Sequence, residues 1–379
     1  DYLNLNTCRF LWKQVKFPTA TDASNTTAQV LKQGEVQGSD VAAHSAGVLD
    51  IKTTILPDAD ALFLTAIDRY GHELWRWTFP VNKLNQANEV LSPLSNKVTS
   101  TETENELTVK AKNHTFIFSK KDGQLKGVSV NNRKISFANG PRFIGARRAD
   151  RSLDQFYNHD DEKAKEKDRT YSEFPDAAVF TKLDVKEDGG NLIVTANYKL
   201  GNLDKAQWTI NPNGEAVLDY TYNFSGVVDL MGICFDYPED QVISKRWLGA
   251  GPYRVWQNRI HGTQYDVWEN DYNDPIPGET FTYPEFKGYF GSVSWMNIRT
   301  KEGTISLTNE TPDAYIGVYQ PRDGRDRLLY TLPESGISVL NVIPPVRNKV
   351  NSTDLCGPSS QPKWVNGPQS GRIIFRFME

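Results

Sequence analysis

Short stretches that alternate apolar and polar residues recur along the whole chain and predict a protein built almost entirely of β-strands. Alternation places successive side chains on opposite faces of a strand, so one face can be buried. Before residue 80 these stretches are roughly ten residues apart and separated by turn residues, which is typical of an immunoglobulin-like β-sandwich. The spacing leaves room for one more strand before Asp1. The expected strands are residues 11–17, 29–33, 48–55, 61–68 and 73–79.

A second series of strands begins at Leu107. Residues 114–120 and 124–130 flank Lys121-Asp122-Gly123, a sequence typical of a hairpin turn. In residues 191–200 the apolar positions 192, 194, 196 and 198 share one face. Because nothing divides residues 107–379, we expect one large, many-stranded sandwich. The other strands expected in it are residues 215–224, 303–307, 336–342 and 372–377.

The polar segment 82–105 contains Pro93 and a Ser/Thr/Glu run, which predicts a linker between two domains. We therefore expect an immunoglobulin-like β-sandwich over residues 1–95 and a larger β-sandwich over residues 96–379. Helical patterning is nearly absent. Only residues 160–169 could hold a short helix, and their charge density favours a solvated surface loop.

Composition narrows the class of protein. A hydrophobic content of 38% and a charged content of 24% are typical of a globular protein, and no apolar run is long enough to span a membrane. The net charge of −4 argues against nucleic acid and anionic membranes as partners. Cys8, Cys234 and Cys356 are odd in number and far apart, so they predict neither a disulfide framework nor a zinc site. Because the chain starts with neither Met nor a signal peptide, we expect a mature terminus or a fragment. The sequence does not decide the compartment; a periplasmic or extracellular bacterial location is preferred to a cytoplasmic one.

The stretch Trp247–Arg259 is the densest in unusual residues. Its glycines and proline predict a tight bend, flanked by aromatic rings and two arginines. Rings that stack on a sugar and forked donors that bind hydroxyls are typical of a carbohydrate groove. The alternative is a core strand that leaves through a Gly-Pro turn, with the arginines in surface ion pairs. The sugar-binding candidates here and in later segments are Arg254, Trp256, Arg259, Trp268, Tyr283 and Trp364.

Candidate chemistry is sparse. The sequence has no Gly-rich phosphate loop, no Gly-x-Ser-x-Gly, no His-Glu-x-x-His and no strand–helix alternation of a (β/α)₈ barrel. We expect no cofactor, although the oxygens of Asp271–Asp274 leave open a structural Ca²⁺, Mg²⁺ or Na⁺ ion without EF-hand spacing. His261 could form an acid–base pair on a sugar ring with Asp266 or Glu269, or it is an ordinary loop residue.

Trp247-Leu-Gly-Ala-Gly-Pro252 resembles the β-galactosidase small-chain domain of family 2 glycoside hydrolases of the bacterial β-galactosidase type. The likeness includes residues 114–125, which resemble the opening strands of that domain, and Gly140–Asp150, which resembles its Phe-x-Arg-Ala-Pro-x-Asp-Asn-Asp segment. Residues 47–77 resemble the immunoglobulin-like domain that precedes it. The resemblance implies a galactose-mutarotase-like supersandwich for the large domain. It also implies that the catalytic glutamates of the family lie in a (β/α)₈ barrel N-terminal to Asp1.

Two departures from the family's pattern are visible. Cys356 stands where the family lends a tryptophan to the active site, and Tyr283–Gly288 differs from the family's Pro-x-Glu-Asn-Gly stretch. Galactose specificity is therefore not implied, and other β-linked sugars are open.

Three functional hypotheses result. The chain is the non-catalytic C-terminal part of a glycoside hydrolase that supports a barrel of the same protein and binds carbohydrate. Alternatively it is a stand-alone module that binds β-linked glycans, or an aldose epimerase that uses His261.

Overall fold

The computed structural model describes residues 3–22, 27–82, 97–148, 171–174, 176–271, 288–318, 335–345 and 357–379. Within these ranges every regular element is a β-strand, apart from three 3₁₀ turns: η1 (Leu5–Thr7), η2 (Glu239–Gln241) and η5 (Pro358–Ser360). The strands form three antiparallel sheets. The prediction of an all-β chain is confirmed.

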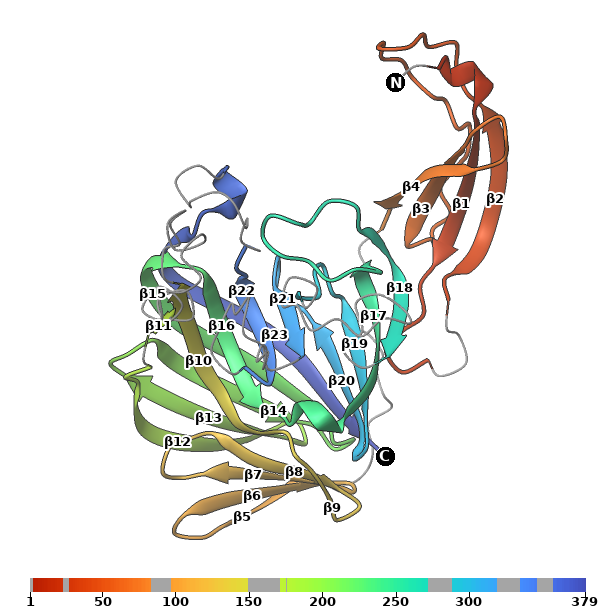
Figure 1. Cartoon of the computed structure of the whole chain (residues 1–379). Helices are drawn as coiled ribbons and strands as arrows, with labels where there is room; N and C mark the ends of the chain where they lie inside the picture. Colours follow the sequence, from red (N-terminus) through yellow and green to blue (C-terminus); the bar gives the residue numbers. More distant parts are fainter. Residues whose placement is uncertain are drawn as a thin grey trace.

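The first sheet is formed by β1 (Arg9–Lys16), β2 (Gln29–Gln37), β3 (Ala61–Ile67) and β4 (Glu73–Pro80), in the order β2-β1-β3-β4 (Figure 1). A second sheet that would complete an immunoglobulin-like sandwich is not found among the described residues, so that detail stays a prediction. The strand expected at residues 48–55 is wrong, because this segment has no strand structure. The buried side chain of Gln14 binds it instead, donating to Thr54 O (2.8 Å) and accepting from Leu56 N (2.7 Å).

The second sheet has ten strands, eight of them in the order β21-β22-β16-β10-β8-β7-β6-β5, with β9 paired to β8 and β11 paired to β10. The predicted hairpin is confirmed, with Gly123 at φ 73° in the turn, a conformation that glycine adopts without strain. The strands are β5 (Thr99–Glu102), β6 (Glu106–Ala111), β7 (His114–Ser119), β8 (Leu125–Val130), β9 (Arg133–Ile135), β10 (Ala138–Arg148), β11 (Tyr171–Glu173), β16 (Leu230–Asp236), β21 (Tyr315–Val318) and β22 (Ile337–Val342).

The third sheet has nine strands in the order β12-β13-β14-β15-β23-β20-β19-β17-β18. Its strands are β12 (Val179–Asp188), β13 (Asn191–Lys199), β14 (Leu203–Ile210), β15 (Ala216–Val228), β17 (Val242–Gly251), β18 (Gln264–Asp271), β19 (Trp295–Thr300), β20 (Gly303–Asn309) and β23 (Lys363–Met378).

The two large sheets enclose one core, as the undivided β pattern predicted. Phe137 from the ten-stranded side stacks on Phe235 at 4.5 Å and packs on Phe375 of the nine-stranded sheet at 5.1 Å. Leu192, Val194 and Ala196 are buried on the face predicted from alternation. Period-2 patterning therefore identified the inner faces of these strands.

The segment predicted as a linker contains a strand. Thr99–Glu102 forms the edge strand β5 and pairs with β6, because a polar strand with both faces in water can still bond a neighbour through its backbone. Residues 83–96, which contain the expected domain boundary, and residues 160–169 lie outside the described part of the chain. The boundaries 1–95 and 96–379 stay predictions.

The N-terminal sheet packs on one end of the nine-stranded sheet, at β17, β18 and β19 (Figure 1). Phe17 and Phe63 share a buried apolar cluster with Leu248 and Trp295. The indole N–H of Trp295 donates to Pro18 O (3.0 Å), and Asn297 Nδ2 donates to Ala20 O (2.8 Å). Apolar burial and directional hydrogen bonds together fix the orientation of this contact.

Candidate functional site

The Trp247–Arg259 motif starts as a core strand and ends as a loop on the ten-stranded sheet. Trp247 is fully buried and packs edge-on against Phe290 with ring centres 4.8 Å apart. Gly251 lies against the ring of Trp268, where a Cβ would come within 2.6 Å of Trp268 Cγ. Glycine is therefore required here because an aromatic ring occupies the space of a side chain.

Two of the candidate sugar-binding residues belong to this loop and are buried. Trp256 is 2% exposed, packs against Tyr289 at 5.5 Å and belongs to a cluster with Cys234 and Leu340 on the outer face of the ten-stranded sheet. Arg254 is also buried, with its guanidinium 5.1 Å from the centre of the Phe290 ring, a cation–π distance. Neither side chain offers a surface on which a sugar could stack.

Trp268 has a structural role as well. Its ring is partly buried, and its Nε1 donates to Gly249 O (3.2 Å) and Gln264 O (3.1 Å). The bond to Gly249 joins β18 to the end of β17, and the bond to Gln264 lies within β18. Three of the six candidates therefore stabilise the fold of the motif.

The other candidates are exposed or undescribed. Arg259 is exposed on the loop, and its backbone N–H donates to Trp256 O (2.8 Å). Trp364 is 70% exposed near the start of β23. Tyr283 lies outside the described residues, as do Cys356 and most of the Asp271–Asp274 segment.

Gln257 and Asn258, for which the sequence predicted no role, bind a distant segment of the chain. Gln257 Nε2 donates to Ser359 O (2.9 Å) and Gln361 O (2.7 Å), and Asn258 Nδ2 donates to Ser360 Oγ (3.0 Å). The loop thereby fixes residues 359–361, directly before β23. The adjacent carboxamides of Gln257 and Asn258 were the only sign of this role in the sequence. The partners of Gln257 could not be read from it, because they lie 102 and 104 residues further along the chain.

Asp266, one of the two carboxylates considered as an acid–base partner of His261, lies at the contact between the N-terminal sheet and the nine-stranded sheet. Asp266 Oδ2 forms an ion pair with Arg76 Nη2 of β4 at 2.8 Å. Burial raises the pKa of Asp266, while the Val267 amide and Arg76 oppose that rise. His261 and Glu269 are both exposed. The structure thus gives Asp266 an architectural partner instead of the ring of His261.

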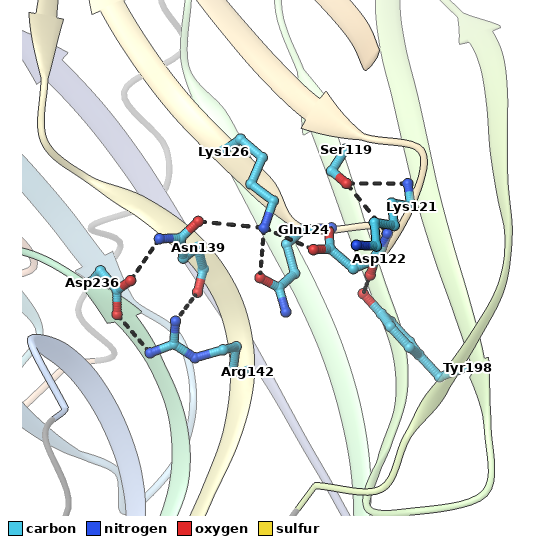
Figure 2. A network of polar contacts seen from close by, with 9 residues as sticks. All are labelled: Ser119, Lys121, Asp122, Gln124, Lys126, Asn139, Arg142, Tyr198 and Asp236. Carbon is cyan, nitrogen blue, oxygen red and sulfur yellow. Dashed lines mark hydrogen bonds and ion pairs between the residues drawn. The ribbon is translucent and has the colours of Figure 1, made fainter. Parts of the chain in front are cut away.

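A second polar region lies on the ten-stranded sheet, and Figure 2 shows its connected side chains. Arg142 Nη2 donates to Asp236 Oδ1 (2.6 Å), and Asn139 Nδ2 donates to Asp236 Oδ2 (2.6 Å). Lys126 continues the network by binding Asp122 at 2.8 Å. The sequence indicated Asp122 as part of a hairpin turn but gave no sign of this network, because its members come from separate strands and that turn.

Each charge in this network has an opposite charge as its partner. Burial alone would raise the pKa of Asp236, but the hydrogen bonds from Arg142 and Asn139 hold it below its ordinary value. At neutral pH the network is therefore ionised and self-neutralising, and it ties β8, β10 and β16 together. This arrangement is that of a structural network, not of a catalytic pair with separated pKa values.

In the described ranges, no three His, Cys, Asp or Glu side chains gather where they could hold a metal ion. No helix in the same ranges is long and apolar enough to cross a membrane.

The fold and these regions define an all-β protein with a large two-sheet sandwich and a smaller sheet attached to one end. The sequence profile described as beta galactosidase small chain matches residues 110–343, more than half of the chain. The chain belongs to the β-galactosidase small chain family. Comparison with curated proteins gives no match.

Solved structures show a more distant likeness. A galactose 1-epimerase from Lactobacillus acidophilus NCFM is 9% identical, with a TM-score of 0.39 over 74% of this chain and 98% of that chain. A GalM/aldose epimerase homologue from C. elegans is 7% identical, with a TM-score of 0.37 over 74% of this chain and 99% of that chain. A copper-containing benzylamine oxidase from Hansenula polymorpha is 8% identical, with a TM-score of 0.30 over 98% of this chain and 77% of that chain. Similarities this low carry no argument about the activity of this chain.

Proposed function

We propose that this chain is the non-catalytic C-terminal part of a β-galactosidase-like glycoside hydrolase that acts in carbohydrate degradation. Membership of the β-galactosidase small chain family carries this proposal. In it, the large sandwich and the N-terminal sheet support a catalytic (β/α)₈ barrel elsewhere in the same protein. The family 2 assignment and the bacterial source belong to the same proposal.

The contact between the N-terminal sheet and the sandwich supports a scaffold role. Arg76 and Thr78 on β4 both reach β18, through Asp266 and through the Tyr265 carbonyl oxygen (3.0 Å). Trp295 adds its bond to Pro18 from β19. Buried rings and hydrogen bonds fix the N-terminal sheet relative to the sandwich. A catalytic barrel that contacts both parts would therefore be held in one orientation.

The opposite face of β4 supports a docking role. Trp75, Trp77 and Phe79 alternate with Arg76 and Thr78, so they point away from the sandwich, and all three are exposed. β4 is also an edge strand of its sheet. Exposed aromatic rows on edge strands mark surfaces that another element covers. In our proposal the catalytic barrel of the same protein covers this row.

The proposal is tested by incubating the chain with aryl β-galactosides, β-glucosides and β-mannosides and following release of the aryl group. We expect no turnover above that of buffer. Turnover that scales with the concentration of the chain and survives further purification would refute the non-catalytic assignment. Polarimetry with freshly dissolved α-galactose, on the chain and on His261→Ala, tests the epimerase alternative: we expect no acceleration from either.

A further inference from the structure

The first half of β23 carries an exposed ring on a polar sheet face. Val365 packs against the core and Ile373, Phe375 and Phe377 are buried, so the odd-numbered residues of β23 point inward. The even-numbered residues therefore point outward from the nine-stranded sheet. Trp364 is the first of them and the most exposed tryptophan in the chain's described part, at 70%. An indole this open has no packing role that explains it.

The ladder between β23 and β15 places hydrogen-bonding groups beside that ring. Trp364 pairs with Val227, Asn366 with Ser225, and Pro368 with Asn223. Ser225 Oγ donates to Asn366 Oδ1 (2.8 Å), which shows that both side chains lie on the same face. Successive outward residues of a strand are about 7 Å apart, so the amide of Asn366 lies next to the indole.

The polar strip continues across the sheet. Asn223 donates from Nδ2 to Asp204 Oδ2, and the side chain of Asn202 donates to the Asn223 carbonyl oxygen (2.8 Å). These contacts hold the amides in fixed orientations before any ligand arrives, which lowers the entropic cost of binding. The strip from Trp364 to Asp204 thus combines one flat apolar ring with preoriented donors and acceptors.

We propose that this strip, consisting of Trp364, Asn366, Ser225, Asn223 and Asp204, is a binding site for a neutral hexopyranose oligosaccharide. The C–H face of a sugar ring would stack on Trp364, and its hydroxyls would exchange hydrogen bonds with Asn366, Ser225 and Asn223. Within the strip, the groups other than the ring are uncharged except for the Asp204 carboxylate, which favours a neutral glycan over an anionic one. A protein partner would need a contiguous apolar patch, whereas here Val227 lies across from the ring and the next outward pair, Asn366 and Ser225, is polar.

The Trp-Leu-Gly loop has a part in this site without touching the ligand. Gln257 binds the carbonyl oxygen of Gln361, three residues before Trp364. The loop thus determines where β23 begins and where the ring stands. Gln257 is a positioning residue for the glycan site.

The site is independent of the proposed hydrolase role, since glycan binding is measured without turnover. Isothermal titration and tryptophan fluorescence of the full chain would use soluble β-linked gluco-, galacto- and manno-oligosaccharides, with an oligogalacturonide as the anionic comparison. We expect one neutral series to bind with a blue shift of the emission. Trp364→Ala should weaken that binding about tenfold or more, and Trp364→Phe should lose less because it retains a ring. Asn366→Ala should also weaken it.

The matched control is Tyr70→Ala, which removes a ring of nearly equal exposure (69%) between β3 and β4 and should leave the affinity unchanged. Because Trp364 and Tyr70 are exposed, both variants should keep the melting temperature of the parent chain. Failure of every neutral oligosaccharide to bind would overturn the proposal. So would equal binding by Trp364→Ala, an equal loss in Tyr70→Ala, or a preference for the anionic oligomer.

Discussion

The side chain of Gln257 donates a hydrogen bond to the backbone oxygen of Gln361 at 2.7 Å, joining the end of the Trp-Leu-Gly motif to the segment that starts β23. The same amide group reaches Ser359 O at 2.9 Å. Gln257 is buried, so its bonds are shielded from water. A motif that looks like a ligand site in the sequence acts in the structure as a support for a distant strand.

Gln257→Leu should release this segment. The substitution keeps much of the side chain's volume but removes the donor to two part-buried backbone oxygens, which costs about 0.5–1.5 kcal/mol of unfolding free energy. Hydrogen exchange of the amides of residues 357–363 should become faster. Gln241→Leu, in the 3₁₀ turn η2, is the control and should change neither quantity. Unchanged exchange in Gln257→Leu would show that other contacts hold the segment.

Trp295→Phe tests the contact between the N-terminal sheet and the sandwich. The variant retains a buried ring but removes the donor to Pro18 O, so we expect a loss of about 1–3 kcal/mol in a urea titration. We also expect faster proteolysis between the two parts. Trp268→Phe loses a donor within the sandwich and serves as the comparison: it should lower stability without that change in proteolysis. If both variants are cleaved alike, the Trp295 bond does not couple the two parts.

Gly251→Ala tests the close packing inside the motif. A Cβ at Gly251 would lie 2.6 Å from Trp268 Cγ and 2.7 Å from its Nε1, so the ring must move. We expect a loss of about 1–3 kcal/mol from overpacking. Gly127→Ala in β8 is the matched control, because no atom lies within 4 Å of its Cβ position. Its stability should stay close to that of the parent. A similar loss of stability in both variants would show that replacing glycine in a strand is itself the cause, and that the contact with the Trp268 ring is not.

His114 should make stability depend on pH. Burial lowers the pKa of His114, although the hydrogen bond between its Nε2 and Phe377 O (2.8 Å) opposes this. The folded chain therefore binds the proton less readily than the unfolded chain does. The free energy of unfolding should fall as the pH drops below about 6.5, by at most about 1.4 kcal/mol per pH unit. The measurement is a series of urea titrations between pH 8 and pH 5.

His114→Gln removes the titrating group and keeps a donor for Phe377 O. The free energy of unfolding of this variant should be nearly independent of pH over the range in which His114 titrates. The plots of this free energy against pH for the parent chain and for the variant should therefore converge at low pH. Parallel curves would mean that another group causes the slope.

The strand pattern was readable because burial on one face imposes a period of two on the residues themselves. The run 192, 194, 196 and the hairpin around Gly123 are local signals, and the structure has both. Residues 48–55 misled the prediction because their alternation resembles a strand, whereas the amide of Gln14 provides the bonds that a neighbouring strand would have provided. These bonds come from a residue that lies 40 positions before Thr54 and 42 before Leu56.

Sequence alone determined that this chain is all-β, that its second part is one large sandwich, and that Trp247–Pro252 marks its family, since each depends on local patterning or on a contiguous motif. Only the tertiary structure decided which aromatic rings face water. Trp256 is covered because β10, β16 and β22 meet beneath the loop, and Trp364 is open because its side chain points away from the core on which its neighbour Val365 packs. Exposure is set by residues brought together from distant strands, and no local stretch of sequence contains them all.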